Sequence, residues 1–291
     1  MDKNILIELN HLSTLQFNGE GAIDLLQGQI TCDVQKVSPN NSCLGALCNA
    51  KGKVISSFLV CKLDTPNYCL IGDHEALIKA KEELEKYSPF YKVQMDLTNN
   101  FNFLAIDKKI LAANYGKGLF KKKNTIEIGS IKYFSYLNKK LALVACKKKE
   151  IDLLKKGFEI KKDILDWDLD EILLKNVEVN AGNSGIYTPH ELNYDLNDRI
   201  DFEKGCYTGQ EIVARMHYRS KNLPRLSLGE TDSPDVAENM SVTNTQDRKI
   251  GKVVKVVNLN EKSMCLISSK EKKLSKEKNI IREIDCEVVL I

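Results

Sequence analysis

A short segment around residue 206 combines the groups that make a cysteine nucleophilic. Cys206 lies two residues after Lys204, and Gly205 and Gly209 remove side chains on either side of it. A nearby cation favours the thiolate over the thiol, and the thiolate is the nucleophilic form. Cys206 and Lys204 are therefore the candidate catalytic pair. From the residues alone, a buried structural cysteine in a tight turn explains the pattern equally well.

The residues after Cys206 predict the helix that positions it. Thr208 and Glu211 have the spacing of a capping box, so a helix is expected to begin just after Cys206. The unpaired backbone N–H groups at such a helix start attract negative charge and favour a thiolate that points toward them. The expected buried stripe of this helix consists of Ile212, Val213 and Met216.

Positive charge is concentrated downstream of the thiol. Between residues 204 and 225, five cations stand against the single acid Glu211, with tyrosine and histidine side chains between them. Arginines beside aromatic rings suit a carboxylate tail, a phosphate backbone or unstacked bases, and a charged outer helix face is an equally good explanation. The five cations are Lys204, Arg215, Arg219, Lys221 and Arg225.

The first part of the chain mixes helix and strand patterns. A helix is expected over 19–27, with Asn18 as its N-cap and Gly28 as its end. Apolar and β-branched runs at 44–48 and 54–63 predict two antiparallel strands, because a turn-forming sequence separates them.

The rest of the chain completes an α+β pattern. Asp73 is the expected N-cap of a further helix, and from residue 226 short strands with little helical periodicity predict a compact β-barrel. This order does not fit a regular alternation of strands and helices. Further strands are expected at 101–107, 125–134 and 141–146, and a further helix at 150–156.

Composition limits the functional classes. The chain has 291 residues, a net charge of +3 and nine cysteines, without a C-x-x-C pair and with four histidines. We therefore expect no metal site and a protein with reduced thiols in the cytoplasm, since no secretory leader opens the sequence. No apolar run approaches the roughly 20 residues that span a bilayer, so no membrane association is expected.

Three motifs, in order along the chain, resemble those of the YgfZ family, the folate-binding relatives of the glycine-cleavage T-protein. They are the Q-G-Q-I-T-C-D-V sequence at 27–34, the A-K-G-K turn at 50–53 and the K-G-C-Y-T-G-Q-E octet at 204–211. A weaker match places Trp167 ahead of Asn183-Ser184-Gly185 and Pro189. Together these matches cover most of residues 10–225.

The resemblance implies a fold and a ligand. It implies an α+β, three-domain ring like that of the T-protein, with a folate-binding region over 1–225, a middle lobe at roughly 45–150 and a small β-barrel over 226–291. Tetrahydrofolate or a derivative would enter a central opening that Cys206 faces. The family is associated with the maintenance of iron–sulfur enzymes, including one that methylthiolates tRNA.

The resemblance also assigns site residues. An aromatic slot would hold the pterin and cations would hold the glutamate tail. Arg219 and Lys221 are the expected contacts of the anionic tail. Leu12 stands where some members have a second tryptophan, and Asp198-Arg199 stands where members often have two glycines. The expected folate contacts are Trp167, Leu12, Asn49, Tyr207, Gln210 and Arg215.

One departure separates the chain from the aminomethyltransferase. Ser56-Ser57 occupies the positions at which T-proteins carry an acidic pair, and a hydroxyl cannot supply the charge of a carboxylate. We therefore expect no glycine-cleavage activity.

Three functions follow from these observations. The leading hypothesis is a folate-binding accessory protein that supports the synthesis or repair of iron–sulfur enzymes, including tRNA methylthiolation. The first alternative is a folate-dependent one-carbon transferase with Cys206 as nucleophile. The second is a tRNA-binding module whose affinity falls steeply with salt. The expected partners are a reduced folate and iron–sulfur or tRNA-modifying enzymes, with direct binding of tRNA left open.

Overall fold

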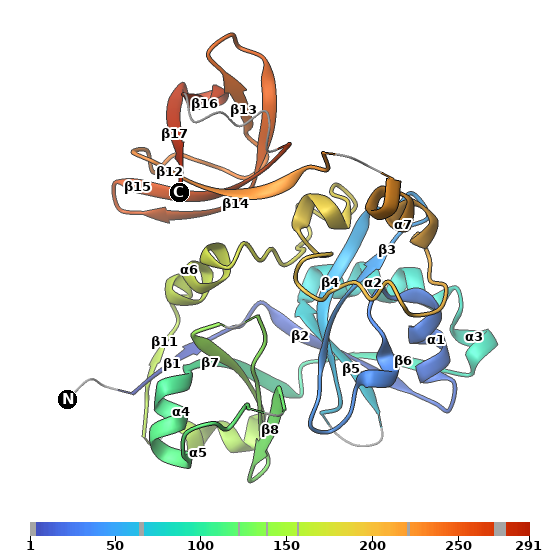
Figure 1. The fold of residues 1–291 in the computed structure, drawn as a ribbon. Coiled ribbons are helices and arrows are strands. Elements are labelled where there is room, and N and C mark those ends of the chain that lie inside the picture. The colour runs from blue at the N-terminus through green and yellow to red at the C-terminus, as the bar shows by residue number, and fades with distance from the viewer. Residues whose placement is uncertain are drawn as a thin grey trace.

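The computed structural model describes residues 4–63, 67–121, 123–137, 139–155, 157–219, 222–270 and 278–291, and within these ranges leaves out the side chains at 153 and 155. Two lobes, each built on a β-sheet, lie side by side, and a β-barrel lies above them (Figure 1). The predicted α+β class, with two sheet-containing lobes and a C-terminal barrel, is confirmed. The boundaries of the domains stay a prediction.

The first lobe contains a five-stranded sheet in the order β3-β4-β5-β2-β6. β3 and β4 pair antiparallel around a turn at 49–53, as the sequence predicts. Asp73 accepts a hydrogen bond from the backbone N–H of Ala76 at 3.0 Å, which confirms it as the N-cap of α2. The elements are β2 (Leu12–Asn18), α1 (Ala22–Gln29), η1 (Val34–Lys36), β3 (Cys43–Cys48), β4 (Val54–Cys61), β5 (Tyr68–Asp73), α2 (His74–Glu85), α3 (Ser88–Tyr91) and β6 (Gln94–Thr98).

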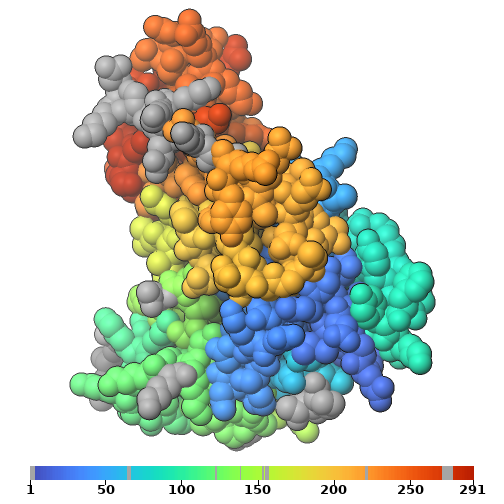
Figure 2. All heavy atoms as spheres, turned by 45° about the vertical axis from the view of Figure 1, so that its right-hand side comes forward, coloured from blue at the N-terminus to red at the C-terminus, as the bar shows by residue number. Residues whose placement is uncertain are grey.

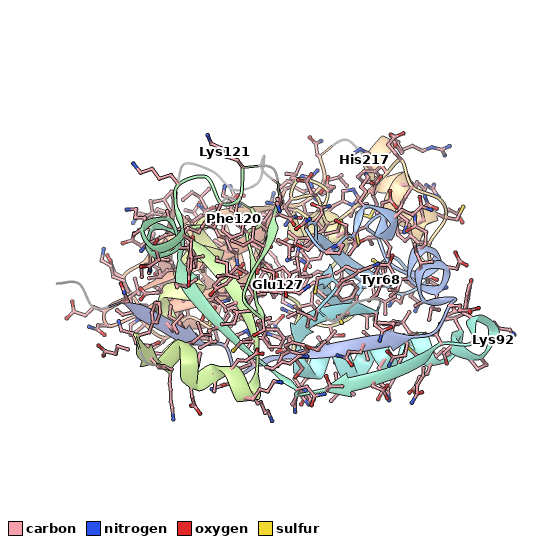
Figure 3. All side chains as sticks on the ribbon, turned by 90° about the horizontal axis from the view of Figure 1, so that it is seen from below. Tyr68, Lys92, Phe120, Lys121, Glu127 and His217 are labelled. Carbon is pink, nitrogen blue, oxygen red and sulfur yellow. The ribbon has the colours of Figure 1, made fainter. Side chains whose placement is uncertain are left out.

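The second lobe contains a six-stranded sheet in the order β11-β1-β7-β10-β9-β8. Seen from below, its strands lie beside the sheet of the first lobe, with Phe120 and Lys121 to the left of His217 in the view (Figure 3). The elements are β1 (Ile5–Glu8), β7 (Phe101–Asp107), α4 (Lys108–Tyr115), β8 (Thr125–Ile128), β9 (Ile131–Phe134), β10 (Leu141–Lys147), η2 (Lys148–Glu150), α5 (Ile151–Lys155) and β11 (Glu159–Lys161).

The remaining elements link the lobes to a closed barrel with the strand order β12-β15-β14-β13-β16-β17. α6 (Leu165–Leu173) packs against β14 and β15, and α7 (Gln210–Arg219) packs against η3 (Pro189–Leu192). Residues from about 180 to 219 cover one face between the barrel and the first lobe (Figure 2). The barrel elements are β12 (Arg225–Thr231), β13 (Ser241–Asn244), β14 (Lys249–Leu259), β15 (Lys262–Ser269), β16 (Asn279–Ile281), η4 (Arg282–Ile284) and β17 (Cys286–Leu290).

Two local predictions are wrong. α1 begins at Ala22, because Asn18 ends β2 and its side-chain amide donates to Asp96 at 3.1 Å instead of capping the helix. The helix also continues through Gly28, its predicted end, to Gln29. The predicted strand over 125–134 is a hairpin of β8 and β9, because Gly129 adopts a φ of +64° and reverses the chain.

Side-chain contacts join the two lobes along one line. The side-chain amide of Asn124, just before β8, donates to the carbonyl of Ser42 at 2.7 Å and accepts from the backbone N–H of Ser42 at 2.7 Å. Nearby, the ammonium of Lys132 donates to the carbonyl of Lys62 at 2.8 Å. Among the described residues, no helix is both long and apolar enough to cross a membrane.

Candidate functional site

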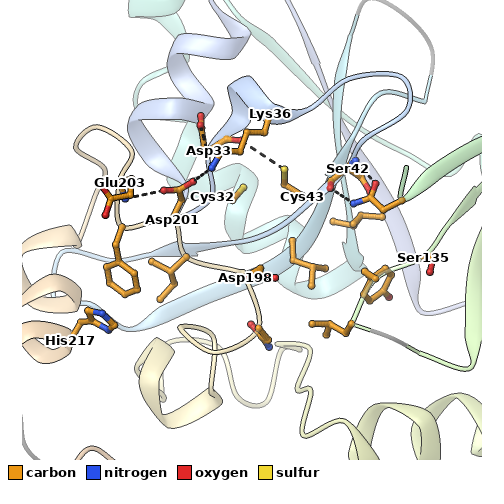
Figure 4. Close-up of a pocket in the computed structure, with 18 of the residues that line it drawn as sticks. Cys32, Asp33, Lys36, Ser42, Cys43, Ser135, Asp198, Asp201, Glu203 and His217 are labelled. Atoms are coloured by element: carbon orange, nitrogen blue, oxygen red, sulfur yellow. Dashed lines mark hydrogen bonds and ion pairs between the residues drawn. The ribbon is translucent and has the colours of Figure 1, made fainter. Parts of the chain in front are cut away.

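A cavity of about 850 Å³ lies between the first lobe, the second lobe and the segment 197–218 (Figure 4). Its volume lies within the roughly 300–1,000 Å³ typical of small-molecule sites. The first lobe contributes the polar residues Cys32, Asp33, Lys36, Ser42 and Cys43. The other lining residues are Leu44, Leu59, Asn124, Ser135, Tyr136, Leu137, Asn197, Asp198, Ile200, Asp201, Phe202, Glu203, His217 and Tyr218.

One corner of this cavity is charged. The ammonium of Lys36 lies 2.5 Å from Asp201 and 3.9 Å from Asp33. Partial burial opposes ionisation of Asp201, but the hydrogen bond and charge of Lys36, together with the backbone N–H groups of Glu203 and Lys204, outweigh it and lower the pKa of this carboxyl. Asp198, which has a φ of +61°, and Glu203 add two further carboxylates to the wall. The corner therefore offers acceptors for ligand N–H groups.

Aromatic rings also line the cavity. The rings of Phe202 and His217 stack with centroids 3.9 Å apart, and the ring of Tyr218 meets His217 edge-on at 4.9 Å. Tyr136 contributes a further ring from the second lobe. A planar ligand would thus find both aromatic rings and carboxylates in the wall of the cavity.

The ammonium of Lys204 is occupied by the backbone of the first lobe. Its Nζ donates to the carbonyls of Gln27, Ile30 and Cys32 at 2.7, 2.7 and 3.0 Å. Two of these carbonyls lie at or just beyond the end of α1, where backbone oxygens lack helical partners. Burial lowers the pKa of Lys204. In this arrangement Lys204 fastens the 204–211 segment to the first lobe, and its predicted catalytic role stays a prediction.

Glycine geometry fastens the same segment to the β3–β4 turn. Gly209 has a φ of +83°, and a Cβ there would lie 2.5 Å from the carbonyl oxygen of Asn49. Gly52 has a φ of +68°, and its Cβ would lie 2.9 Å from Ile212. The side-chain oxygen of Asn49 accepts from the backbone N–H groups of Lys51 and Lys53, both at 3.0 Å. Two of the three sequence motifs are therefore packed against each other.

Cys206 itself is exposed and does not line the cavity. α7 begins at Gln210, and the hydroxyl of Thr208 donates to the side chain of Gln29 at 2.7 Å instead of forming the expected capping box. Of the three residues expected on the buried side of α7, only Val213 is fully buried. Tyr207 is also buried, and burial raises the pKa of its hydroxyl, so it serves as an anchor beside the exposed thiol.

Trp167 lies behind the cavity wall. It is 4% exposed, and the ammonium of Lys139 lies 3.7 Å from its ring centroid and 4.5 Å from that of Tyr136. Lys139 pairs with the buried carboxylate of Glu171, and burial holds the pKa of Lys139 well below its usual range. Leu12 packs against the same apolar cluster as Trp167. Neither side chain lines the cavity.

A second buried ion pair occupies the region of the departures from the family pattern. Arg199 is fully buried and pairs with Glu178, while the hydroxyl of Ser57 donates to Glu178 at 2.7 Å. Burial opposes ionisation of Glu178, but Arg199 and this hydrogen bond outweigh it and lower its pKa to about 2. The backbone N–H of Val179 donates to Ser57 at 2.8 Å. Ser57 thus positions a carboxylate supplied by another segment.

The structure places the predicted cations in different environments. Arg215 and Arg219 are exposed and line a shallow depression on α7 together with Tyr218. Arg225 instead forms a two-point ion pair with Asp195 at 2.6 and 2.8 Å. Gln210 is half-buried at the start of α7. Lys221 lies outside the described residues.

Sequence reasoning missed most of the cavity lining. The stacked pair Phe202 and His217 and the ion pair of Lys36 with Asp201 join distant segments. Of the residues that line the cavity, only Cys32 and Asp33 belong to one of the three motifs, the one at 27–34. That motif is the sequence signal that points to the cavity.

Comparison with known proteins gives one consistent group. The family model described as GCVT N-terminal domain matches residues 1–107. The tRNA-modifying protein YgfZ of Colwellia psychrerythraea is 31% identical over 228 residues, which cover 76% of this chain and 70% of that protein. The YgfZ protein of Hamiltonella defensa is 29% identical, covering 89% and 81% of the two chains. The crystal structure of the glycine cleavage system aminomethyltransferase T from Bartonella henselae matches 99% of this chain and 85% of its own with a TM-score of 0.76 at 13% identity, which is a likeness of fold.

Proposed function

This chain belongs to the YgfZ family, and from that premise we propose that it is a folate-binding accessory protein with a role in tRNA modification. Its curated relatives carry the name tRNA-modifying protein. The finer part of the proposal is that a reduced folate binds in the cavity and that the clients are iron–sulfur enzymes acting on tRNA.

One observation carries the folate assignment. Tyr218 lines both the cavity and the depression that holds Arg215 and Arg219. A folate has a planar pterin at one end and carboxylates at the other, so a ligand with its pterin in the cavity can pass Tyr218 and reach two guanidinium groups. Arginine is the side chain best suited to binding carboxylates.

The cavity suits the pterin chemically. A pterin donates hydrogen bonds from its amino group and ring N–H groups, and Asp33, Asp198 and Glu203 supply carboxylate acceptors in the wall. The rings of Tyr136 and Phe202 provide surfaces for its faces. A few placed polar groups beside aromatic walls are the usual design of a cofactor site.

The other predicted folate residues act on the walls of this site. Trp167 and Leu12 support Tyr136 from behind, since Lys139 lies between the rings of Trp167 and Tyr136. Asn49 and Tyr207 lie where the 204–211 segment packs against the β3–β4 turn, and Gln210 is the first residue of α7. On this view they determine affinity through the shape of the cavity.

The exposed thiol indicates where the client binds. Cys206 is held on a fixed segment but faces outward, away from the cavity lining. A group in this position can contact another macromolecule without displacing the folate. We assign Cys206 to the contact with the client enzyme.

The folate assignment is tested by calorimetry with tetrahydrofolate carrying one or three glutamates. The double variant Arg215→Gln/Arg219→Gln should weaken the triglutamate about three- to tenfold, because exposed ion pairs each contribute about 0.2–1 kcal/mol. The monoglutamate should lose less. Arg248→Gln, an exposed arginine on the barrel, is the matched control. Equal losses for both ligands would remove the tail assignment, and no binding of either by the wild type would remove the folate.

The role in tRNA modification is tested by complementation. Cells that lack this protein should regain tRNA methylthiolation with the wild type and with Cys286→Ala, but not with Cys206→Ala. Full rescue by Cys206→Ala would make this thiol dispensable. Normal methylthiolation in the uncomplemented cells would overturn the proposed role itself.

A further inference from the structure

Three side chains from two segments, 190–195 and α7, meet at the edge of the cavity. Nε2 of His190 and Nδ1 of His217 each lie 3.8 Å from the same carboxylate oxygen of Asp195, Oδ2. All three atoms lie within 4.8 Å of one another. His217 also lines the cavity, as Figure 4 shows. Neither the comparison with relatives nor the motif analysis assigns this cluster a function.

The fold holds His190 and Asp195 firmly. Thr188 caps η3 by accepting from the backbone N–H of Glu191, which places His190 on this short helix. Asn193 then turns the chain with a φ of +58° and brings Asp195 back beside the histidine. His190 and the side chain of Asp195 are both almost completely buried.

His190 is a buried side chain that points to a ligand. It is 0% exposed, and neither ring nitrogen has a hydrogen-bond partner among the described residues. Leaving a buried polar nitrogen unpaired costs about 1–3 kcal/mol, so such an atom calls for an explanation. A neutral imidazole has one ring nitrogen with a lone pair that it can donate to a metal ion.

We propose that His190, Asp195 and His217 bind a divalent first-row transition metal ion, with Zn²⁺ as the reference ion. Two imidazole nitrogens and one carboxylate oxygen are a donor set that such ions prefer, whereas Mg²⁺ and Ca²⁺ prefer oxygen ligands alone. The proposal departs from the expectation drawn from the sequence, in which these three residues form no recognisable spacing.

The distances fit one ion. Two ligand atoms about 2.1 Å from a shared ion are separated by at most about 4.2 Å, and 3.8 Å from each nitrogen to Asp195 satisfies this limit. The nitrogen pair, separated by at most 4.8 Å, closes with a small inward shift of His217. His217 can make this shift because its side chain is 35% exposed, while stacking on Phe202 fixes its ring plane.

Arg225 completes the surroundings. Its guanidinium donates to both oxygens of Asp195, and a carboxylate oxygen has a second lone pair for a metal. Metal-bound carboxylates are commonly held by such outer hydrogen bonds. With three protein ligands and His217 facing the cavity, a remaining coordination position is open to water or to a cavity ligand.

The experiment uses the full chain, stripped of metal with a chelator and kept reduced, and titrates it with Co²⁺ and then Zn²⁺. We expect one equivalent of Co²⁺ to give visible absorption bands without the near-ultraviolet charge-transfer band of a cobalt–thiolate bond, and Zn²⁺ to displace it. His217→Asn should weaken Co²⁺ binding at least about tenfold, since even outer-shell partners contribute 10–100-fold. His74→Gln, whose ring contacts Ser13 instead, should bind as the wild type does.

The outcomes decide the proposal. Equal affinity in the wild type and His217→Asn, a thiolate band that shows binding at cysteines, or no binding by the wild type each overturn it. His217 is the primary target because it lies partly exposed on the surface of α7. Circular dichroism of the variant establishes that its fold is kept.

Discussion

Replacing Lys204 with methionine separates a structural role from a catalytic one. The wild-type ammonium donates to the carbonyls of Gln27, Ile30 and Cys32 at 2.7–3.0 Å, and the last two of these contacts are buried. Methionine keeps much of the side chain's length but donates no hydrogen bond. Each of the two buried carbonyls left unpaired costs about 1–3 kcal/mol, so we expect the free energy of unfolding to fall by about 2–6 kcal/mol.

The assay is urea unfolding followed by circular dichroism. A chain with several lobes can unfold in more than one step, so the variant and the wild type are compared at the transition whose midpoint shifts. The dependence of the unfolding free energy on urea should stay the same in both. Lys36→Met is the matched control: its ammonium also pairs across segments, with Asp201, but its side chain is 60% exposed. Exposed ion pairs contribute about 0–1 kcal/mol, so this control should lose less than 1 kcal/mol.

The reactivity of the Cys206 thiol provides a second readout. The rate at which iodoacetamide alkylates Cys206 is measured in the same variants, against a Cys206→Ala background that reports on the other thiols. If Lys204→Met unfolds within about 0.5 kcal/mol of the wild type while alkylation of Cys206 slows tenfold, the ammonium serves the thiol and the structural account is wrong.

Two further variants test the fold around the cavity. The carboxyl of Glu178 has a pKa of about 2, below its ordinary 4.5, because Arg199 and a hydrogen bond outweigh its burial. The ionised carboxylate therefore contributes about 3 kcal/mol to the free energy of unfolding above pH 4.5, and this contribution is lost as the pH falls toward 2. Glu178→Gln should therefore show a flatter loss of stability between pH 5 and pH 3 by urea unfolding, and equal slopes would contradict this. Gly209→Ala should lower the free energy of unfolding by at least about 2 kcal/mol in the same assay, because its Cβ would meet the carbonyl of Asn49 at 2.5 Å in a positive-φ conformation. The control Gly205→Ala has open space around it and should be near neutral. Similar losses in both variants would disprove the contact.

Local signals explain which elements the sequence predicted well. The β3–β4 hairpin follows from two apolar strands around a turn, and the start of α2 follows from the side chain of Asp73. Both depend on residues within a few positions of each other. The start of α1 was mispredicted because Asn18 bonds to Asp96, a partner far along the chain.

The candidate site depends on long-range contacts, which spacing cannot reveal. The motif around Cys206 names a candidate segment, but the direction of the Lys204 side chain is set by carbonyls more than 170 residues away. The aromatic wall similarly needs Phe202 on a loop and His217 on a helix to stack. Burial of His190 beside Asp195 became visible only in three dimensions.

The contacts between Ser42 and Asn124 determine how a ligand can reach the cavity. Both residues line the cavity, and their hydrogen bonds join the two lobes. The hydrogen bond from Lys132 to the carbonyl of Lys62 joins the lobes along the same seam. A protein that captures its ligand by swinging two domains together needs a hinge with few contacts across it. Here, hydrogen bonds between side chains and backbone cross the seam, and they favour a fixed arrangement of the two lobes. A ligand must therefore enter and leave the cavity without separation of the two lobes across this seam.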